Sequence, residues 1–357
     1  MALFKDILHS DESLFKNELA LDYSFLPKIL PHREQQQRYI ATIIKPLLSG
    51  KSGKNLFIYG APGIGKTAAM RFVINELEEE TDEVYAIYIN CWQKNTTFKI
   101  TADICEQLGY KFTHNKRTEE LFAIAKNMLN KKAAVFAFDE VDKLEDIDFL
   151  YALLEEIYKK SIILVTNDKE WLSDLDDRVK SRLLAETLEF KPYGLFETKD
   201  VLRQRTEYAF FPGILNDDAF ELIANKTAEV QDIRTGLHLM REAANIAESK
   251  SARKITLEDA QKALAKLDQF TIKKSTDLTE DEQKILDIIK KNSDKKIGEL
   301  YITYKELGGE LVYKSFQRKI EKLERNRFIS VKKVSGGADG NTSIINYASP
   351  AKKLTEF

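Results

Sequence analysis

The sequence predicts an α/β domain built on a parallel sheet, followed by an all-helical domain and a small α+β domain. From Asn55 to Pro192, short apolar runs alternate with longer amphipathic stretches, which is typical of a parallel sheet covered on both faces by helices. Strand signals stop after Pro192 and return only as two short runs near the C-terminus. With 357 residues, of which 43% are hydrophobic and 31% charged, the chain can form two or three packed domains.

The first domain is expected at 1–192, with 1–30 as an N-terminal arm. Its apolar runs predict strands at Asn55–Tyr59, Val84–Asn90, Ala133–Phe138, Ile162–Thr166 and Ala185–Phe190. The amphipathic segments between them predict helices at Gly65–Glu79, Phe98–Leu108, Thr118–Asn130, Asp148–Tyr158 and Asp176–Leu184.

Three further segments follow the predicted sheet. Residues 193–270 predict an all-helical domain, with helices at Leu195–Phe210, Asn216–Thr227, Asp232–Ser249 and Thr256–Leu267. The polar residues 271–278 are expected to form a linker. Residues 279–357 predict helices at Thr279–Lys291, Leu300–Leu307 and Tyr313–Arg325, then a hairpin of Phe328–Val334 with Thr342–Tyr347. Three helices followed by a hairpin are the winged-helix pattern.

Composition argues against two classes of protein. The apolar runs Ala133–Phe138 and Ser161–Val165 are far shorter than the ~20 residues that span a bilayer, and charges interrupt positions 1–30, where a signal peptide needs an apolar core. Two cysteines, Cys91 and Cys105, cannot form a disulfide framework in a chain of this size. We therefore expect a cytoplasmic protein that is neither membrane-embedded nor held together by disulfides.

Charge is distributed unevenly along the chain. The formal net charge is −2, but residues 277–357 hold 16 basic and 13 acidic residues, whereas the remaining 276 residues hold 39 and 44. Within Leu311–Ser335, eight basic residues stand against two acidic ones, a balance of +6 in 25 residues. This pattern indicates a surface for a polyanion near one end of the chain.

A complete G-x-x-x-x-G-K-[ST] motif occupies Gly60–Thr67, between the first predicted strand and the first predicted helix. This context favours a phosphate site over a chance glycine turn, because the glycines let backbone N–H groups face phosphates and the helix N-terminus adds a positive dipole. We expect Lys66 to reach the β- and γ-phosphates of ATP, or the β-phosphate of ADP, and the Thr67 hydroxyl to hold Mg²⁺. The residues assigned to nucleotide binding in this loop are Gly60, Pro62, Gly63, Ile64, Gly65, Lys66, Thr67 and Ala68.

Polar side chains end two later strands of the predicted sheet. Asp139 and Glu140 follow the apolar run Val135–Phe138, and Asn167 follows Ile162–Thr166. The carboxyl ends of parallel strands meet at one edge of a sheet, where ligands bind. We expect Asp139 to act on the metal, Glu140 to polarise the attacking water and Asn167 to contact the γ-phosphate. The alternative for the two acids is a solvated turn after a buried strand.

The predicted helix Tyr313–Arg325 carries an apolar stripe and a basic stripe with the same spacing, about 200° apart around the helix. The apolar stripe consists of Val312, Phe316, Ile320 and Leu323. Such a helix is typical of one that enters the major groove of duplex DNA, and the alternative is a winged helix that binds protein. The residues assigned to DNA contact are Lys314, Ser315, Gln317, Arg318, Lys322, Arg325, Arg327, Lys332 and Lys333.

The order of the P-loop, the Asp–Glu strand end, the Asn strand end, an Arg-bearing helix and a helical lid resembles AAA+ ATPases. Several segments further resemble the archaeal origin-recognition/Cdc6-type DNA replication initiators, and the match extends over nearly the whole chain. These segments are Leu30–Glu34, Gly60–Thr67, Ile89–Cys91, Phe138–Leu144, Leu175–Leu183, Phe190–Tyr193 and Asp232–Ala247. The resemblance implies an AAA+ core with an all-α lid and a C-terminal winged helix.

The resemblance also implies roles for individual residues. Asn167 would be sensor 1, and Arg234 would be sensor 2, reaching the phosphates from the lid. Arg178 would be the arginine finger that acts on a neighbouring subunit's nucleotide, with Arg182 as the competing candidate. Further nucleotide contacts are implied for Pro31, His32, Arg33, Tyr193 and Arg205. The catalytic set is then Lys66, Asp139, Glu140, Asn167, Arg178 and Arg234.

The chain departs from the family pattern at two places. It has Val230-Gln-Asp where the family usually has Gly-Asp, so the lid helix that bears Arg234 is expected to start differently. In the stretch Trp92–Ile104, where the family carries an extra DNA-contacting helix, the basic residues are only Lys94 and Lys99.

These features together predict an ATP-dependent DNA replication initiator with slow, switch-like ATP hydrolysis. It would bind duplex origin DNA through the winged helix and the AAA+ core and help to recruit an MCM-type replicative helicase, acting with itself or with a paralogue. Two alternatives share most of these motifs. One is a paralogue that binds DNA as a repressor or accessory factor, and the other is a signalling-type P-loop ATPase whose winged helix binds protein.

Overall fold

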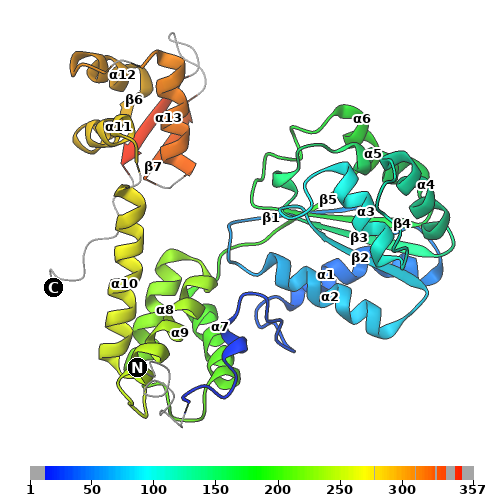
Figure 1. Cartoon of the computed structure of the whole chain (residues 1–357), viewed down its shortest axis with the longest axis horizontal. Coiled ribbons are helices and arrows are strands. Elements are labelled where there is room, and N and C mark those ends of the chain that lie inside the picture. Colours follow the sequence, from blue (N-terminus) through cyan, green and yellow to red (C-terminus); the bar gives the residue numbers. More distant parts are fainter. Residues whose placement is uncertain (1–12, 277, 310, 326–327, 335–341, 348–357) are drawn as a thin grey trace. The chain divides into compact units, whose positions relative to one another are not determined.

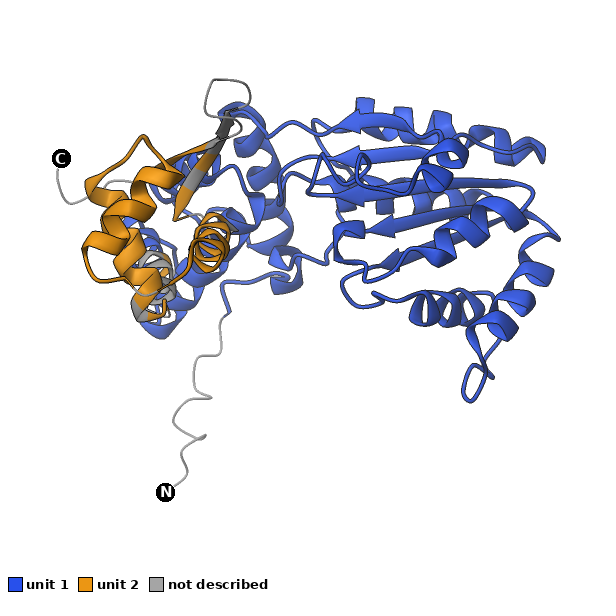
Figure 2. Ribbon diagram, turned by 90° about the horizontal axis from the view of Figure 1, so that it is seen from above, with its two compact units in different colours: residues 1–265 blue, residues 266–357 orange. Residues whose placement is uncertain are grey.

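The computed structural model describes residues 13–276, 278–309, 311–325, 328–334 and 342–347. The chain forms two compact units, residues 1–265 and residues 266–357 (Figure 2). None of the described helices is long and apolar enough to cross a membrane.

A five-stranded parallel sheet forms the core of unit 1 (Figure 1). Its strands are β1 (Leu56–Tyr59), β2 (Val84–Asn90), β3 (Ala133–Asp139), β4 (Lys160–Thr166) and β5 (Glu186–Glu189), in the order β2-β3-β4-β1-β5. Every neighbouring pair is parallel. The order brings the carboxyl ends of β1, β3 and β4 side by side, so the residues that follow these strands gather at one edge. The predicted parallel sheet is confirmed.

Helices cover both faces of this sheet because its strands are apolar on both sides. Along β1, Leu56 and Ile58 pack into one core cluster and Phe57 into the other. The first cluster includes side chains of α1 (Glu34–Ile44), the 3-10 helix η2 (Lys45–Ser49) and α2 (Lys66–Glu80). The second includes side chains of α3 (Thr97–Gln107), α4 (Thr118–Leu129), α5 (Asp148–Glu156) and α6 (Asp177–Leu183). Figure 1 shows the resulting three layers. A short 3-10 helix, η3 (Val141–Lys143), follows β3.

The remainder of unit 1 is helical, as predicted. It contains α7 (Leu195–Ala209), α8 (Asp217–Val230), α9 (Ile233–Ser249) and α10 (Leu257–Thr276), the last of which continues into unit 2. Residues 13–30 are the described part of the N-terminal arm, which we assigned to the sheet domain, and they include a segment that packs on these helices. Its 3-10 helix η1 (Glu18–Leu21) buries Ala20 and Leu21, and the N–H groups of Lys16 and Asn17 donate to the Ala209 carbonyl at the end of α7.

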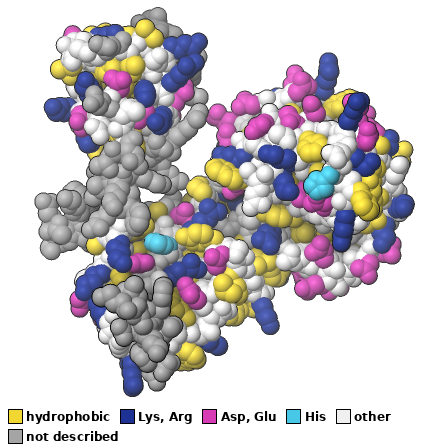
Figure 3. Space-filling model, viewed as in Figure 1, with side chains coloured by type: hydrophobic (Ala, Val, Ile, Leu, Met, Phe, Trp, Pro, Cys, Tyr) yellow, Lys and Arg dark blue, Asp and Glu magenta, His cyan; other side chains and the backbone are white. Residues whose placement is uncertain are grey.

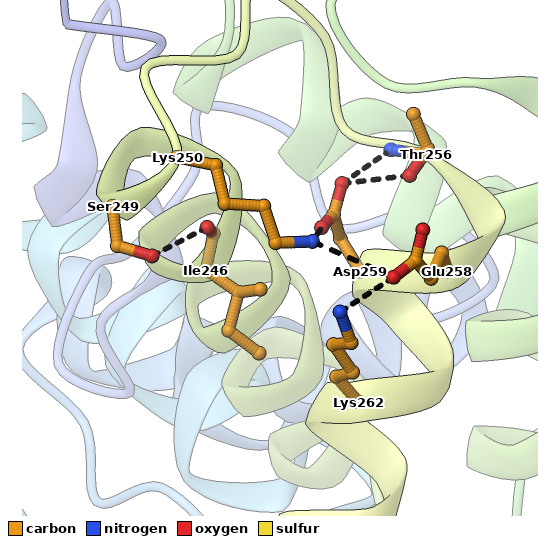
Figure 4. Close-up of polar contacts among 7 residues, drawn as sticks. All are labelled: Ile246, Ser249, Lys250, Thr256, Glu258, Asp259 and Lys262. Atoms are coloured by element: carbon orange, nitrogen blue, oxygen red, sulfur yellow. Dashed lines mark hydrogen bonds and ion pairs between the residues drawn. The ribbon is translucent and has the colours of Figure 1, made fainter.

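A buried carboxylate fixes the start of α10 (Figure 4). Asp259 is 2% exposed and accepts hydrogen bonds from the backbone N–H and hydroxyl of Thr256, at 3.0 and 2.8 Å, and from Lys250 Nζ at 2.6 Å. The helix then runs to Thr276, so most of the stretch 271–278 that we expected as a linker is helical. No glycine or proline interrupts α10, which explains why the polar composition of its end does not stop it.

Unit 2 is a small α+β domain with one strand that the sequence did not reveal. Its elements are α11 (Glu280–Lys291), β6 (Lys295–Lys296), α12 (Ile297–Glu306), α13 (Tyr313–Arg325), β7 (Ile329–Val334) and β8 (Thr342–Tyr347). Antiparallel pairing gives a three-stranded sheet in the order β6-β8-β7. The two residues of β6 are too few to produce a period-2 signal. The winged-helix assignment of 279–357 stays a prediction.

Candidate functional site

The P-loop connects the carboxyl end of β1 to α2, as the motif predicts. Gly65 is the residue before α2. Gly60 has φ 150°, and a Cβ there would lie 2.4 Å from the Phe190 carbonyl oxygen, so any side chain would push the loop off the sheet. The loop therefore follows a path that only glycine permits at this point.

Lys66 is buried, and its ammonium is hydrogen-bonded to three other groups of the site. Its Nζ donates to the carbonyl oxygens of Gly60 and Ala61, at 2.9 and 2.7 Å, and to Asn167 Oδ1 at 2.8 Å. Burial lowers the pKa of Lys66 to about 8, against the opposing charge of Asp139. The direct hydrogen-bond acceptors of the ammonium are all neutral, and a phosphate would supply a negatively charged acceptor. Lys66 and Asn167, each of which we expected to contact the γ-phosphate, thus lie together.

Asp139, 2% exposed, lies next to Thr67. Its Oδ2 accepts hydrogen bonds from the Thr67 hydroxyl at 2.8 Å and from the Tyr88 hydroxyl at 3.2 Å. Burial raises the pKa of Asp139, although these hydrogen bonds and the charge of Lys66 oppose the rise. A hydroxyl beside a carboxylate is the oxygen donor set that Mg²⁺ prefers, so the residues present fit that ion. Sequence reasoning missed Tyr88, which the pairing of β2 with β3 places beside Asp139.

Glu140 follows Asp139 in the left-handed backbone region, with φ 56° and ψ 45°. Such a conformation is uncommon for a residue with a side chain and turns the chain sharply at the end of β3. Burial and the nearby carboxylates of Asp139 and Asp142 raise the pKa of Glu140, while Arg234 opposes this. Asp142, two residues further along the chain, accepts a hydrogen bond from the Thr166 hydroxyl at 2.9 Å.

Arg33 and Tyr193 meet behind the P-loop. Both are buried, and the Arg33 guanidinium lies 3.8 Å from the centroid of the Tyr193 ring. Arg33 donates to the Ile64 carbonyl at 2.9 and 3.1 Å and to the Lys191 carbonyl at 2.8 Å. These hydrogen bonds tie the P-loop backbone at Ile64 to the segment that follows β5.

Two other residues implied by the resemblance, His32 and Arg205, make hydrogen bonds to other segments of this chain. His32 Nε2 lies 2.9 Å from Asp200 Oδ2 on α7, which ties the segment before α1 to the lid. Arg205 is buried and donates to the carbonyls of Ala20 and Phe25 in the N-terminal arm, at 3.1 and 2.9 Å. The third such residue, Pro31, is half-buried beside His32.

The lid reaches the P-loop through the first residues of α9. Asp232 caps this helix by accepting from the Arg234 N–H at 2.9 Å, and the Ile233 N–H donates to the Gly63 carbonyl at 3.2 Å. A Cβ on Gly63 would lie 1.8 Å from Asp232 Oδ1. Gln231, which stands at the departure from the family pattern, adopts φ 58°, so α9 starts at Ile233 without a glycine. Arg234 is exposed, and its positive charge lowers the pKa of Lys66 and opposes the rise in the pKa of Glu140.

Arg178 and Arg182 differ in their surroundings on α6. Arg182 pairs with Glu155 and lies 5.0 Å from the centroid of the Tyr151 ring. Arg178 is exposed, and within the described part of the chain its side chain has no ion pair. The acid beside it, Asp177, pairs with Lys180 at 3.4 Å. Of the two candidates, Arg178 is the one available to another molecule.

On α13 the apolar stripe is buried at Phe316, Ile320 and Leu323, but Val312 lies before the helix and is exposed, which corrects its assignment to the core. Lys314 and Arg318 are exposed, and Ser315 and Gln317 are half-buried. Lys322 pairs with Glu282 of α11 at 2.9 Å. Arg327 and the side chains of Arg325, Lys332 and Lys333 lie outside the described residues.

The surface of unit 1 carries side chains of both charges, unlike the basic helix α13. On the face shown in Figure 3, Lys and Arg side chains of unit 1 are interspersed with Asp and Glu side chains. This mixture agrees with the slightly acidic balance of the chain outside residues 277–357.

Comparison with known proteins gives consistent matches along the chain. Residues 49–170 match the family model of an AAA domain, and residues 199–265 match the Cdc6 AAA+ ATPase-type lid domain. The ORC1-type DNA replication protein 1 of Sulfurisphaera tokodaii is 32% identical, with 95% of this chain and 91% of that protein covered. The ORC1-type DNA replication protein of Thermococcus kodakarensis is 34% identical, with 96% and 90% covered.

Solved structures agree with these matches. The Aeropyrum pernix ORC1 protein in complex with DNA is 28% identical and superposes with a TM-score of 0.70, covering 94% of each chain. The Aeropyrum pernix ORC2 protein, with a TM-score of 0.70 and 18% identity over 94% of each chain, shares the fold. The resemblance to AAA+ initiators is thereby confirmed, and the chain belongs to the archaeal Orc1/Cdc6 family of ORC1-type DNA replication proteins.

Proposed function

We propose that this protein is an ATP-controlled initiator that binds duplex DNA at replication origins. The observation that carries the proposal is the convergence of Lys66, Thr67, Asp139 and Asn167 at the carboxyl edge of the sheet, linked by hydrogen bonds of 2.8 Å. Three segments far apart in the sequence thus supply a cation, a metal-binding pair and an amide at one place. This is the set of groups that phosphoryl transfer from a nucleotide requires.

Each group has a distinct task in ATP hydrolysis. Lys66 binds the β- and γ-phosphates, and Asn167 holds the Lys66 ammonium while it contacts the γ-phosphate. Thr67 and Asp139 would hold Mg²⁺, which would neutralise charge on the phosphates. Glu140 orients and polarises the attacking water, and because burial and neighbouring carboxylates raise its pKa, it is a stronger base than a solvated glutamate.

The lid and α6 each carry an arginine that suits a switch with slow ATP hydrolysis. Arg234 lies near Lys66 and Glu140 while its helix begins at the P-loop, so the state of the phosphates would be transmitted to the lid. Arg178 has no ion pair among the described residues and would complete the site of a neighbouring copy or a paralogue. Hydrolysis would therefore be slow in the isolated protein and would reset it after assembly.

DNA binding is proposed for unit 2, folded as a winged helix with α13 as the recognition helix. Its exposed Lys314 and Arg318 lie one helical turn apart, opposite the buried apolar stripe, and would contact phosphates. A relative of known structure, the Aeropyrum pernix ORC1 protein, was solved in complex with DNA. Recruitment of an MCM-type helicase is proposed as the output of the switch.

A fluorescence-anisotropy titration of labelled duplex DNA with the full chain tests the DNA-binding part of this proposal. It would be run from about 0.05 to 0.3 M salt, once with ATP and once with ADP. We expect a log–log salt slope of about −4 to −6, as for four to six phosphate contacts, and an affinity that differs between the two nucleotides. Absence of binding below about 10 µM at low salt would overturn the initiator function and favour a protein partner for unit 2.

A further inference from the structure

A buried glutamate lies beneath the basic helix of unit 2. Glu282, in the first turn of α11, is 0% exposed. Its Oε2 accepts from the Thr279 N–H at 3.1 Å, which closes a capping box at the start of α11. Its other oxygen, Oε1, accepts from two lysines of α13, Lys319 at 2.7 Å and Lys322 at 2.9 Å.

The two lysines differ from the other basic residues at the start of α13 in having this partner. Lys314 and Arg318 are exposed, and within the described part of the chain they have no ion pair. Lys322 continues their spacing of four residues along the helix, and 53% of its side chain is exposed, yet its ammonium turns inward to Glu282. Lys319 makes a further contact with the Thr279 hydroxyl at 3.3 Å.

The ion pairs with Lys319 and Lys322 favour the ionised form of Glu282. Burial by itself would raise the pKa of Glu282, but the hydrogen bonds from Lys319 and Lys322 outweigh burial and lower the pKa to about 2. The glutamate is therefore ionised throughout the physiological range, and one negative charge offsets two positive ones beneath the helix.

Packing alone does not require such a cluster. Replacing a buried ion pair by well-packed apolar residues is often neutral or stabilising, so the cluster is weak evidence for a purely structural role. The same domain has an apolar core, in which Ile285, Leu286 and Phe316 are buried. A glutamate that holds two lysines of the same basic helix changes what that helix presents to DNA.

We propose that Glu282 is a positioning residue that withholds Lys319 and Lys322 from DNA phosphates. This inference rests on the proposed DNA binding of unit 2. Lys314 and Arg318 then form the phosphate-contacting part of the described helix, and Lys322, which the sequence assigned to DNA contact, belongs to the withheld pair. The affinity of the domain for DNA is consequently lower than the charge of its helix would give, which suits an initiator that must discriminate origins from bulk DNA.

The proposal is tested by Glu282→Gln in the full chain. Glutamine keeps the capping box but removes the charge that holds the lysines. We expect the log–log salt slope of DNA binding to become steeper by about one to two and the affinity at 0.15 M salt to rise between about three- and tenfold. Glu306→Gln is the matched control, since it removes the same charge from an exposed position of α12 with no lysine partner among the described residues, and should leave the slope unchanged within about 0.3.

A second measurement keeps the proposal falsifiable if the variant folds poorly. Acetylation of the free wild-type protein, followed residue by residue with mass spectrometry, should modify Lys314 faster than Lys319 and Lys322. The difference should disappear in Glu282→Gln. Equal reactivity of Lys314 and Lys322 in the wild type would overturn the proposal, as would an unchanged salt slope in a folded Glu282→Gln. If the wild type bound no DNA, the proposed function would fail instead, and the acetylation pattern would still report whether the lysines are withheld.

Discussion

In the nucleotide site of unit 1 Lys66 and Asp139 are buried and each has several hydrogen-bond partners, whereas on α13 of unit 2 Lys314 and Arg318 are exposed and have no ion pair among the described residues. Lys66 donates to three acceptors, and Asp139 accepts from two hydroxyls. On α13, the charges with buried partners, Lys319 and Lys322, are the ones that the protein uses internally. In unit 1 the buried charges are the ones proposed to bind the ligand. On α13 the charges with a buried partner are the ones proposed to be withheld from the ligand.

The difference follows from what each ligand demands. A nucleotide phosphate is bound at fixed geometry in a water-poor site, where each charged hydrogen bond counts strongly. A DNA backbone is contacted at many exposed points, each of which exchanges a bound counterion for a side chain. Single substitutions should therefore have large effects in unit 1 and small, additive effects on α13.

Lys66→Ala should give the largest effect. Removal of the buried ammonium takes away the charge that the phosphates would bind, and we expect the affinity for ATP and ADP to fall at least about 100-fold. Titration with a fluorescent ADP analogue measures this. The control is Lys51→Ala, at an exposed position before β1, which should change the affinity less than about twofold. Equal losses in both variants would show that Lys66 does not bind the phosphates.

The pH dependence of the wild type sharpens the same prediction. Because burial lowers the pKa of Lys66 to about 8 in the free protein, its ammonium is lost as the pH rises through that value. Nucleotide affinity should therefore fall above about pH 8, and it should be independent of pH in this range in Lys66→Ala. An affinity that stays constant up to pH 10 would contradict the assignment of Lys66 as the phosphate ligand.

The two regions also differ in how much the sequence reveals. Fixed geometry requires fixed spacing, so Gly60–Thr67, Asp139 and Asn167 could be predicted from local motifs. Tyr88 could not, because its contact with Asp139 depends on the pairing of β2 with β3. The ion pair of Lys322 with Glu282 could not be predicted either, since Glu282 lies 40 positions earlier in the chain. Spacing along a helix predicts which face a residue is on, but it does not identify a partner on another helix.

Gly63→Ala tests the contact between the P-loop and the lid. Gly63 has φ 73°, so alanine costs about 1 kcal/mol for the left-handed backbone, and its Cβ would also lie 1.8 Å from Asp232 Oδ1. Asp232 can move away only by giving up its cap on α9, which costs about 1 kcal/mol more. We expect a total loss of about 2 kcal/mol in urea unfolding.

The control for this variant is Gly213→Ala. Gly213 has φ 78° with nothing within 4 Å of its would-be Cβ, so it carries only the backbone cost of about 1 kcal/mol. In a double-mutant cycle, Asp232→Ala should cost about 1 kcal/mol less in the Gly63→Ala background than in the wild type. Additive losses would show that the P-loop and the lid are not coupled at this point.

Asp259→Asn extends the comparison to a buried charge that binds no ligand. Burial by itself would raise the pKa of Asp259, but the hydrogen bonds from Lys250 and Thr256 outweigh it and lower the pKa (Figure 4). A carboxyl group whose pKa is lower in the folded state stabilises the fold above its unfolded pKa of about 3.9 and loses this contribution as the pH falls through the folded value. We expect Asn to cost about 1–2 kcal/mol at pH 7 and progressively less below about pH 4.

Urea unfolding followed by tryptophan fluorescence at several pH values measures this difference. The matched variant is Glu258→Gln, because Glu258 is the neighbouring acid, pairs with Lys262 and is exposed. Its effect should stay below about 0.5 kcal/mol at every pH. A penalty for Asp259→Asn that does not change between pH 7 and pH 3 would mean that the charge of Asp259 contributes nothing and that only its shape matters.

Lys314→Met and Arg318→Met should give the smallest effects. Each removes one exposed cation with no ion pair among the described residues, so each should reduce the magnitude of the salt slope by about 0.9, and the double variant by about twice that amount. Lys284→Met is the control, since it removes the same charge from an exposed position of α11. If that variant lowered the slope as much as Lys314→Met, DNA would be attracted by the net charge of unit 2 and not by the face of α13. If either α13 variant alone abolished binding, its side chain would behave like Lys66, and exposed charges on this helix would not act independently.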